Sequence, residues 1–332
     1  MKLRETAPVF EIFWPERLDL ARTPTPLEPV PALGRNVWVK RDDMTGVALS
    51  GNKVRKLEFL LAEAKASGAG HVITCGGVNS NHARATAVAA ARVGLKAHLV
   101  LRGEDRRPAF GNLLLSRFVG ATSQFITPSE WEEVDSIMAS VGQGLQNPYV
   151  IPEGGSNALG CLGYARALQE ILHDAQSVGI RVARVVHAVG SGGTTAGLAL
   201  GCAACGVDVD IVGVCVCEDR LAFDRRIRRI LEEAEGRAFI PHGTAKRCRW
   251  RILEGFVGPG YAKTSSEAVA RLRAIGAETG LLFDPVYSGK ALLGLLSMPE
   301  LCTSEDATVF IHTGGIFELF AYAGLIDPAP EK

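Results

Sequence analysis

The sequence has no excess of charge of either sign. Lysine and arginine together number 36, and so do aspartate and glutamate, so the formal net charge is zero. A chain without a net field has no general attraction for nucleic acid or for an anionic membrane surface. We therefore expect no nucleic-acid partner, and a substrate that is a small neutral or zwitterionic molecule.

Long apolar runs are also missing. No run approaches the roughly 20 residues that a helix needs to cross a bilayer. The first residues, Met1 to Thr6, carry charges with no apolar segment behind them, which is unlike a secretory signal. The sequence thus predicts a cytoplasmic protein without a membrane partner.

Cysteine is sparse, with eight in 332 residues, so a disulfide framework is not expected. Cys202 and Cys205 form a C-x-x-C pair and Cys215 and Cys217 a C-x-C pair, spacings that zinc sites also use. The first pair lies in a run of small residues typical of a helix, and the second in a strand-like run. We interpret these cysteines as buried thiols and predict no metal site.

The pattern that is present is a regular alternation of strands and helices, with no internal repeat. Alternating strands and helices of this length are typical of parallel βαβ units. The fold class predicted is therefore α/β, with two open parallel sheets and a ligand site at the carboxyl ends of their strands. The predicted strands are 36–40, 71–74, 96–101, 123–127, 149–151, 184–188, 208–216 and 308–312; the predicted helices begin at 53 and cover 83–93, 112–118, 128–142, 159–172, 198–204, 220–235 and 265–279.

Lys53 stands at a Gly-Asn turn where a helix is predicted to begin. Two further cations follow, Arg55 and Lys56. A lysine that is only solvated more often lies on the outer face of a helix, so we interpret Lys53 as an amine that points into a site. Lys56, three residues further on, shares nearly the same helical face, whereas Arg55 is expected to anchor the loop or a carboxylate elsewhere.

A glycine-rich loop, Gly190 to Gly197, joins a buried strand to a helix. Glycines allow backbone N–H groups to converge on an anion, and the helix N-terminus adds partial positive charge. No lysine follows in the G-K-[ST] form of a P-loop, and Thr195 stands where a dinucleotide fingerprint has its third glycine. We therefore predict a phosphate site here, with a plain tight turn as the alternative.

A second turn, Cys75 to His82, also lies between a strand and a helix. The helix N-terminus, with Ser80 and Asn81, suits a carboxylate group. Helix capping alone would explain one of these polar residues. Three of them behind two glycines favour contact with a ligand.

Two later stretches, Phe283 to Lys290 and Ile311 to Gly315, each end a predicted strand. Both contain small residues that would let a ligand approach the backbone. Tyr287 is either a ligand contact or a core aromatic residue, and Tyr261 lies in a Gly-Pro-Gly loop from which it could reach a pocket. We interpret Lys290 as a solvated charge on a helix rather than a ligand contact. We interpret His312 as a core histidine rather than a catalytic residue.

In this order, S-G-N-K-x-R-K, G-G-x-x-S-N-H, G-S-G-G-T-x-A-G, D-P-V-Y-x-G-K and H-T-G-G resemble the D-cysteine desulfhydrase/1-aminocyclopropane-1-carboxylate deaminase family. These enzymes use pyridoxal 5′-phosphate and have the fold of the tryptophan synthase β-subunit. Each motif alone is weak, but the combination is specific and extends from about Pro24 to Tyr322.

The resemblance implies a role for each matching residue. Lys53 would hold the cofactor covalently and act as the catalytic base, with Ser80 and Tyr287 as further catalytic residues. The cofactor would also contact Lys56, Asn81 and Thr313, the last competing with Ser288 for the pyridine nitrogen. The implied phosphate contacts are Gly190, Ser191, Gly192, Gly193, Thr194 and Thr195, and the implied substrate contacts are Ser80, Asn81, His82, Tyr261 and Tyr287.

Three departures bear on the choice within the family. The ring-opening deaminases carry a glutamate where this chain has Ser288, glutamine where it has His82, and no threonine matching Thr313. The resemblance therefore favours α,β-elimination from a small amino acid, as in D-cysteine desulfhydrase. L-cysteate sulfo-lyase and the deaminase remain alternatives, and a non-catalytic binder of a phosphate ligand is an alternative of another class.

The same resemblance implies a homodimer and two domains. We expect a large cofactor-binding domain, residues 1–54 with 166–332, and a small substrate-side domain, residues 55–165. Residues 232–250 have mixed charge and little periodicity, and no function is predicted for them.

Overall fold

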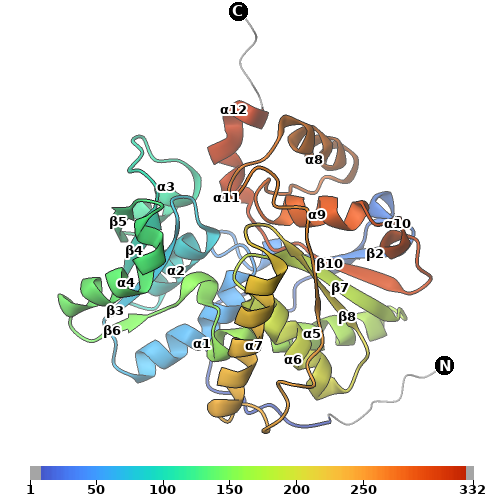
Figure 1. Ribbon diagram of the computed structural model, residues 1–332, viewed down its shortest axis with the longest axis horizontal. Coiled ribbons are helices and arrows are strands. Elements are labelled where there is room, and N and C mark those ends of the chain that lie inside the picture. The colour runs from blue at the N-terminus through green and yellow to red at the C-terminus, as the bar shows by residue number, and fades with distance from the viewer. Residues whose placement is uncertain (1–8, 327–332) are drawn as a thin grey trace, which may run out of the picture.

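The computed structural model describes residues 9–326 and contains two sheets in one molecule. The larger sheet has six strands in the order β1-β2-β10-β7-β8-β9, and the smaller has four in the order β5-β4-β3-β6. In Figure 1 the smaller sheet, with α2 and α4, lies on one side and the larger sheet, with α8 and α9, on the other. The α/β fold class is thus observed.

The larger sheet is parallel except at one edge. Its strands are β1 (Leu27–Pro29), β2 (Val37–Lys40), β7 (Val182–Val189), β8 (Asp210–Cys215), β9 (Arg251–Leu253) and β10 (Ala307–Ile311). Strand β1 pairs antiparallel with β2, so the sequence-based prediction of purely parallel sheets is wrong at this edge. The proline-rich arm favours an extended conformation, and a three-residue edge strand can form from it without the helical crossover that parallel strands need.

All pairs in the smaller sheet are parallel. Its strands are β3 (His71–Gly77), β4 (Lys96–Arg102), β5 (Thr122–Ile126) and β6 (Pro148–Val150). The helices of the chain are α1 (Lys53–Ala66), α2 (Asn81–Arg92), α3 (Gly111–Phe118), α4 (Val134–Gln143), α5 (Ala158–Ser177), α6 (Gly193–Cys205), α7 (Arg220–Gly236), α8 (Ser266–Thr279), α9 (Ser288–Leu296), α10 (Pro299–Cys302), α11 (Ile316–Leu319) and α12 (Ala323–Ile326).

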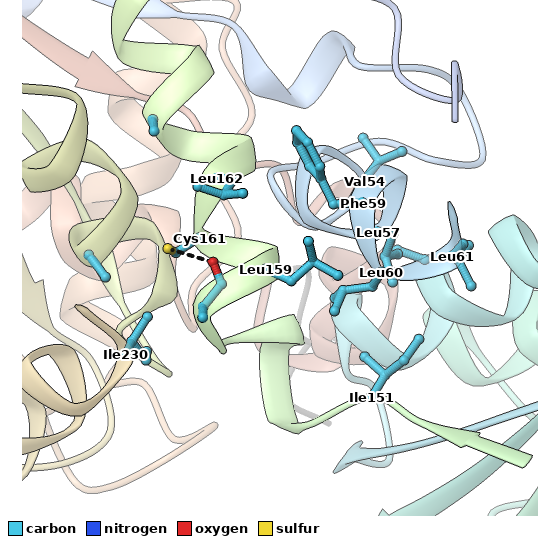
Figure 2. Close-up of a cluster of buried hydrophobic side chains, with 14 of the residues drawn as sticks. Val54, Leu57, Phe59, Leu60, Leu61, Ile151, Leu159, Cys161, Leu162 and Ile230 are labelled. Atoms are coloured by element: carbon cyan, nitrogen blue, oxygen red, sulfur yellow. Dashed lines mark hydrogen bonds between the residues drawn. The ribbon is translucent and has the colours of Figure 1, made fainter. Parts of the chain in front are cut away.

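Helices α1 and α5 form the core beside the site. Figure 2 shows apolar side chains of α1 and Leu159 and Leu162 of α5 in one cluster, with Ile151 next to them. Leu57, Leu60 and Leu61 are inaccessible to solvent. Burying a leucine side chain contributes roughly 1.5–3 kcal/mol. This packing holds the first turn of α1, which carries Lys53, at a constant position.

The largest local difference from the sequence analysis concerns the glycine-rich loop. Helix α6 begins at Gly193, five residues earlier than predicted, so half of that loop is the first turn of the helix. Glycine has a low helix propensity, which made the segment look like a loop. Here tertiary packing overrides propensity, because residues 193–200 are all buried.

The predicted domain boundaries fall inside helices. The boundary at 54/55 lies in the first turn of α1, and that at 165/166 lies in the middle of α5. The strands of the smaller sheet all come from residues 71–150. The exact division of the chain therefore stays a prediction.

Candidate active site

A cavity lies where the carboxyl ends of strands from both sheets meet. Strands β3, β7 and β10 end at it, as expected for parallel sheets. It brings together most of the predicted site residues with others that the sequence analysis did not select. The lining residues are Asn52, Lys53, Gly76, Ser80, Asn81, His82, Glu153, Gly154, Ala188, Val189, Gly190, Ser191, Gly192, Thr194, Thr195, Tyr261, Asp284, Tyr287, Thr313 and Gly314.

Lys53 is the first residue of α1, and its amine lies in this cavity. Its Nζ donates a hydrogen bond to Oδ1 of Asn52 at 2.9 Å. Burial lowers the pKa of Lys53 to about 8, although the carboxyls of Asp284 and Glu153 oppose the shift. A sizeable fraction of the amine is therefore neutral near physiological pH, as a nucleophilic lysine requires.

The glycine-rich loop forms a cradle that side chains would fill. Gly192 has φ of 84°, a left-handed conformation that favours glycine. A Cβ on Gly193 would lie 2.6 Å from Oγ of Ser156, and a Cβ on Gly190 would lie 3.1 Å from the ring of Tyr287. The first N–H groups of α6 have no partner within the helix, and that of Gly193 donates to Oγ of Ser156 at 3.3 Å. The loop therefore has the form and the donors that a phosphate group needs.

Lys56 lies behind this loop and does not line the cavity. Its buried Nζ donates to the carbonyl of Gly154 at 3.2 Å and to Oγ of Ser156 at 3.1 Å. The Ser156 hydroxyl also contacts the Ser191 hydroxyl at 2.8 Å. Burial, with the charge of Lys53 as a smaller cause, lowers the pKa of Lys56 well below its usual value. Lys56 thus reaches the loop through Ser156.

Ser80 and Asn81 begin helix α2. Oγ of Ser80 accepts a hydrogen bond from the backbone N–H of Ala83, which caps the helix and leaves the hydroxyl hydrogen free to donate. The Asn81 carboxamide is held at both ends. Its Nδ2 donates to Oε2 of Glu318 at 2.9 Å, and its Oδ1 accepts from Nδ2 of Asn112 at 2.9 Å. One N–H of Asn81 remains available to a ligand.

His82 is buried and neutral. Oγ1 of Thr74 gives its hydrogen to the carbonyl of Ile151, so the 2.8 Å contact between this oxygen and His82 requires a hydrogen on Nε2. Nδ1 of His82 is then an acceptor, and it has no partner in the described chain. Burial and the charges of Lys53 and Lys56 lower the pKa of His82 well below its usual value. His82 lines the cavity without a side-chain donor for a carboxylate.

Two tyrosines from different segments meet at the cavity. The hydroxyl groups of Tyr261 and Tyr287 lie 2.7 Å apart. Burial raises the pKa of both phenols, so both stay protonated at neutral pH. Each can therefore donate or hold a proton beside a substrate.

Thr313 and Ser288 have different surroundings. Thr313 lines the cavity, whereas the Ser288 hydroxyl donates to Oδ2 of Asp284 and lies 3.2 Å from the carbonyl of Gly314. Asp284 in turn accepts from the backbone N–H groups of Val286 and Tyr287 at the start of α9. Ser288 is thus engaged in holding this turn and does not line the cavity, whereas Thr313 does.

The sequence analysis did not select Asn52, Glu153 and Asp284, which line the cavity, or Glu318, which accepts a hydrogen bond from Asn81. Asn52 and Asp284 stand inside quoted motifs, so their positions carried a signal. The sequence carried no signal for Glu153 and Glu318, because each lies in a short turn without a recognisable pattern. Burial raises the pKa of both carboxyls, that of Glu318 well above its usual value.

No helix among residues 9–326 is long and apolar enough to cross a membrane. The same residues contain no group of three or more histidine, cysteine, aspartate or glutamate side chains that could hold a metal ion. Cys202 in α6 and Cys215 in β8 are buried, and burial raises the pKa of both thiols. The sequence predicted buried thiols in both pairs; Cys202 and Cys215 are buried, whereas Cys205 and Cys217 are only partly buried.

A buried amine of low pKa, a glycine-rich loop at the start of a helix and a donor-rich turn therefore lie together in this cavity. The residues fit pyridoxal phosphate, since Lys53 can bond to its aldehyde and the loop can hold its phosphate. The chain belongs to the pyridoxal-phosphate dependent enzyme family, whose model matches residues 18–314. Its cofactor is therefore pyridoxal 5′-phosphate.

Known relatives agree with this assignment. A Thermotoga maritima protein provisionally named 1-aminocyclopropane-1-carboxylate deaminase is 42% identical over 92% of this chain and 98% of its own. D-cysteine desulfhydrase of Klebsiella pneumoniae is 37% identical over 92% of this chain and 96% of its own. A crystal structure described as an ACC deaminase homologue has a TM-score of 0.83 and 34% identity, and covers 94% of this chain and 95% of its own. The family resemblance and the fold inferred from the sequence are confirmed.

Proposed function

We propose that this enzyme catalyses α,β-elimination from a small amino acid that carries a leaving group on Cβ, with D-cysteine as the first substrate to test. The observation that carries this proposal is one cavity that holds Lys53, the glycine-rich loop, the start of α2 and the two tyrosines. Relatives of similar length include D-cysteine desulfhydrases. The products from D-cysteine would be pyruvate, ammonia and sulfide.

In this proposal the protein holds the cofactor at three points. Lys53 would bond to its aldehyde and residues 190–195 would hold its phosphate, with Lys56 supporting that loop through Ser156. Thr313, which lines the cavity, is the residue we assign to the pyridine nitrogen in preference to Ser288. When bound, pyridoxal phosphate acts as an electron sink for the Cα of an amino acid.

The substrate carboxylate is assigned to the start of α2. Backbone N–H groups of the first turn, the Ser80 hydroxyl and the free N–H of Asn81 are the donors there. His82 forms the wall behind them as a neutral ring. Anchoring the carboxylate in this way would leave the Cα hydrogen accessible to Lys53.

Lys53 is also the proposed base for the Cα proton. Its pKa of about 8 suits an amine that both accepts and returns a proton near neutral pH. The Tyr261 and Tyr287 hydroxyls, protonated and 2.7 Å apart, would donate to the departing group. The enamine that is released would hydrolyse in water to the keto acid and ammonia.

The cofactor linkage is tested on purified protein loaded with pyridoxal phosphate. We expect an absorbance band near the visible that Lys53→Ala abolishes, and a borohydride-reduced adduct on the peptide containing Lys53. Absence of both the band and the adduct would contradict the assigned role of Lys53.

A substrate panel separates the alternatives. Pyruvate release from D- and L-cysteine and β-chloroalanine supports a desulfhydrase, release from cysteate supports L-cysteate sulfo-lyase, and formation of 2-oxobutyrate from the cyclopropane amino acid supports a deaminase. A non-catalytic binder of a phosphate ligand would turn over none of them. Activity that Ser80→Ala and Tyr287→Phe both impair severely would exclude this last alternative.

Three coarser features belong to the same proposal. We infer a homodimer in the cytoplasm, with residues 1–54 and 166–332 as the cofactor domain and 55–165 as the substrate-side domain. The neutral overall charge and the family membership support this group of inferences. Sedimentation equilibrium of the holoenzyme measures the oligomeric state directly.

A further inference from the structure

Charged side chains are few in the active-site cavity. Among the residues that the structure describes, Lys53 is the only lysine or arginine that lines it, and Glu153 and Asp284 are its only carboxyls. The proposed function commits Lys53 to the cofactor, and His82 is neutral. The cavity therefore offers no positive side chain to the β-substituent of a substrate, and the ionisable groups that remain there are acidic.

The two carboxyls differ in what they contact. Both oxygens of Asp284 accept hydrogen bonds at the start of α9, from backbone N–H groups and from the Ser288 hydroxyl. Within the described part of the chain, the Glu153 carboxyl has neither a hydrogen bond nor an ion pair. Arg226, the cation with the strongest influence on it, pairs with Glu218 at 3.1 Å instead. A carboxyl that lines a cavity without a protein partner is available to a ligand.

The turn that carries Glu153 lies between the glycine-rich loop and the start of α2. It follows β6 and continues with two glycines. A Cβ on Gly154 would overlap Oγ of Ser191 in the glycine-rich loop. A Cβ on Gly155 would lie 3.5 Å from Cε1 of His82 in α2. The turn is therefore in close contact with both the part of the site assigned to the cofactor phosphate and the part assigned to the substrate carboxylate.

The Glu153 carboxyl is also close enough to the reacting groups for its charge to act on them. After Asp284, it is the carboxyl that most opposes the lowering of the Lys53 pKa, and it contributes to the raised pKa of the Tyr261 phenol. Burial raises the pKa of Glu153 itself. A nearby cation favours the ionised form of such a carboxyl, so Glu153 gains from a positively charged ligand.

We propose that Glu153 binds an ammonium group on the β-substituent of the substrate, which makes 2,3-diamino acids a substrate class of this enzyme. A hydrogen bond between two charged groups is roughly twice as strong as one between neutral groups. The same cavity offers no second cation to a sulfonate or a phosphate ester at this position. This inference rests on the proposed elimination reaction and specifies its leaving group.

The reaction of 2,3-diaminopropionate balances with water alone. The Cα–H bond breaks and its proton goes to Lys53, while the Cβ–N bond breaks and its electron pair leaves with the nitrogen as ammonia. Because this nitrogen departs from an ammonium group, it needs no proton donor, and a hydrogen-bond acceptor such as Glu153 suits it. The remaining enamine adds water to give pyruvate and a second ammonia, and no oxidant or reductant is required.

The first measurement compares substrates of similar size and different charge. Steady-state kcat/KM is measured on the holoenzyme for 2,3-diaminopropionate, serine and cysteine, each as both enantiomers. The proteins are wild type, Glu153→Gln, Glu153→Asp and the control Glu104→Gln, which alters an exposed glutamate outside the active-site cavity. We expect Glu153→Gln to lower kcat/KM for the diamino acid by about 10- to 100-fold relative to the neutral substrates, with Glu153→Asp intermediate and the control unchanged.

The second measurement does not depend on turnover. Calorimetry on the holoenzyme compares 2,4-diaminobutyrate with 2-aminobutyrate, which differ by one ammonium group and carry no leaving group on Cβ. We expect wild type to bind the diamino acid more tightly, and Glu153→Gln to lose this preference while it still binds 2-aminobutyrate.

An equal loss for the cationic and the neutral substrates would show that Glu153 only positions its turn, and no loss would show that it is not used; either result overturns the inference. If wild type converts no amino acid but its preference for 2,4-diaminobutyrate depends on Glu153, the elimination reaction is wrong and the ammonium site stands. If wild type converts neutral substrates and neither measurement shows a preference that depends on Glu153, the reaction stands and the ammonium site is wrong.

Discussion

Asn81 shows how single residues of this site are oriented by partners that are distant in the sequence. Its carboxamide bonds to Glu318 and to Asn112, and Oδ1 of Asn112 accepts from the buried guanidinium of Arg84 at 3.1 Å. Arg84 also donates to the carbonyl of Ser50, three residues before Lys53. A chain of hydrogen bonds therefore connects the proposed carboxylate site to the segment that precedes Lys53, which favours a fixed relative position of the two.

Burial of Lys53 has a consequence for cofactor attachment. Only the neutral amine attacks an aldehyde, and burial lowers the pKa from 10.5 to about 8. The neutral fraction in the folded protein therefore rises as the pH increases towards 8 and is nearly complete well below 10.5. We expect the rate at which the apoprotein forms its absorbance band with pyridoxal phosphate to be half-maximal near pH 8 and to level off about one pH unit above it. A rate that keeps rising through pH 10 would contradict the lowered pKa.

At the scale of elements, the start of α6 is the feature that depends most on backbone geometry. Gly193 lies under the side chains of Ser156 and Lys56, and a Cβ there would come within 2.6 and 2.9 Å of their polar ends. Both side chains also support the loop from behind. Any shift at this position would move the N–H groups assigned to the phosphate.

Substituting this glycine should therefore weaken cofactor binding more than folding. For Gly193→Ala we expect affinity for pyridoxal phosphate to fall by about tenfold or more, since displaced donors lose hydrogen bonds to a charged group worth about 1.5–3 kcal/mol each. The matched control is Gly236→Ala at the end of α7, where a Cβ would meet nothing within 4 Å. Fluorescence titration of each apoprotein measures the affinity, and equal affinities in the two variants would refute the cradle model.

At the scale of the whole molecule, a buried ionic network ties the larger sheet to the helices beside the site. Arg55 of α1 pairs with Asp42, which follows β2, and with Glu170 of α5. Lys40 of β2 pairs with Glu170 and Asp174. This is the anchoring role that the sequence predicted for Arg55. Losing one partner of such a network leaves a buried charge uncompensated, at a cost of roughly 3–5 kcal/mol.

The network predicts a specific sensitivity to acid. Burial opposes ionisation of Glu170, but hydrogen bonds and charge from Arg55, together with Lys40, outweigh it and lower the pKa from 4.5 to about 2. Because the pKa is depressed in the folded state, the stabilisation is present above pH 4.5 and is lost as the pH falls from 4.5 to about 2. We expect Glu170→Gln to be less stable than wild type at neutral pH and to lose less stability across this acid range.

Urea unfolding midpoints at a series of pH values measure this difference. The control is Glu267→Gln, an exposed glutamate on α8, whose curve should follow that of wild type. Parallel curves for wild type and Glu170→Gln would show that the network does not contribute to acid sensitivity.

The sequence by itself determined the α/β class and the motif residues, because these depend on local pattern, and the resemblance carried by those motifs implied the cofactor. Strand and helix periodicity, glycines before a helix and a lysine at a turn are all visible within a few neighbouring residues. Tertiary structure alone decided which side chains surround them. Contacts between distant segments decide that Glu153 lines the cavity, that Glu318 holds Asn81, that His82 presents an acceptor and that Lys56 lies behind Ser156. Burial and charge proximity, which set pKa and donor availability, exist only once those segments have packed together.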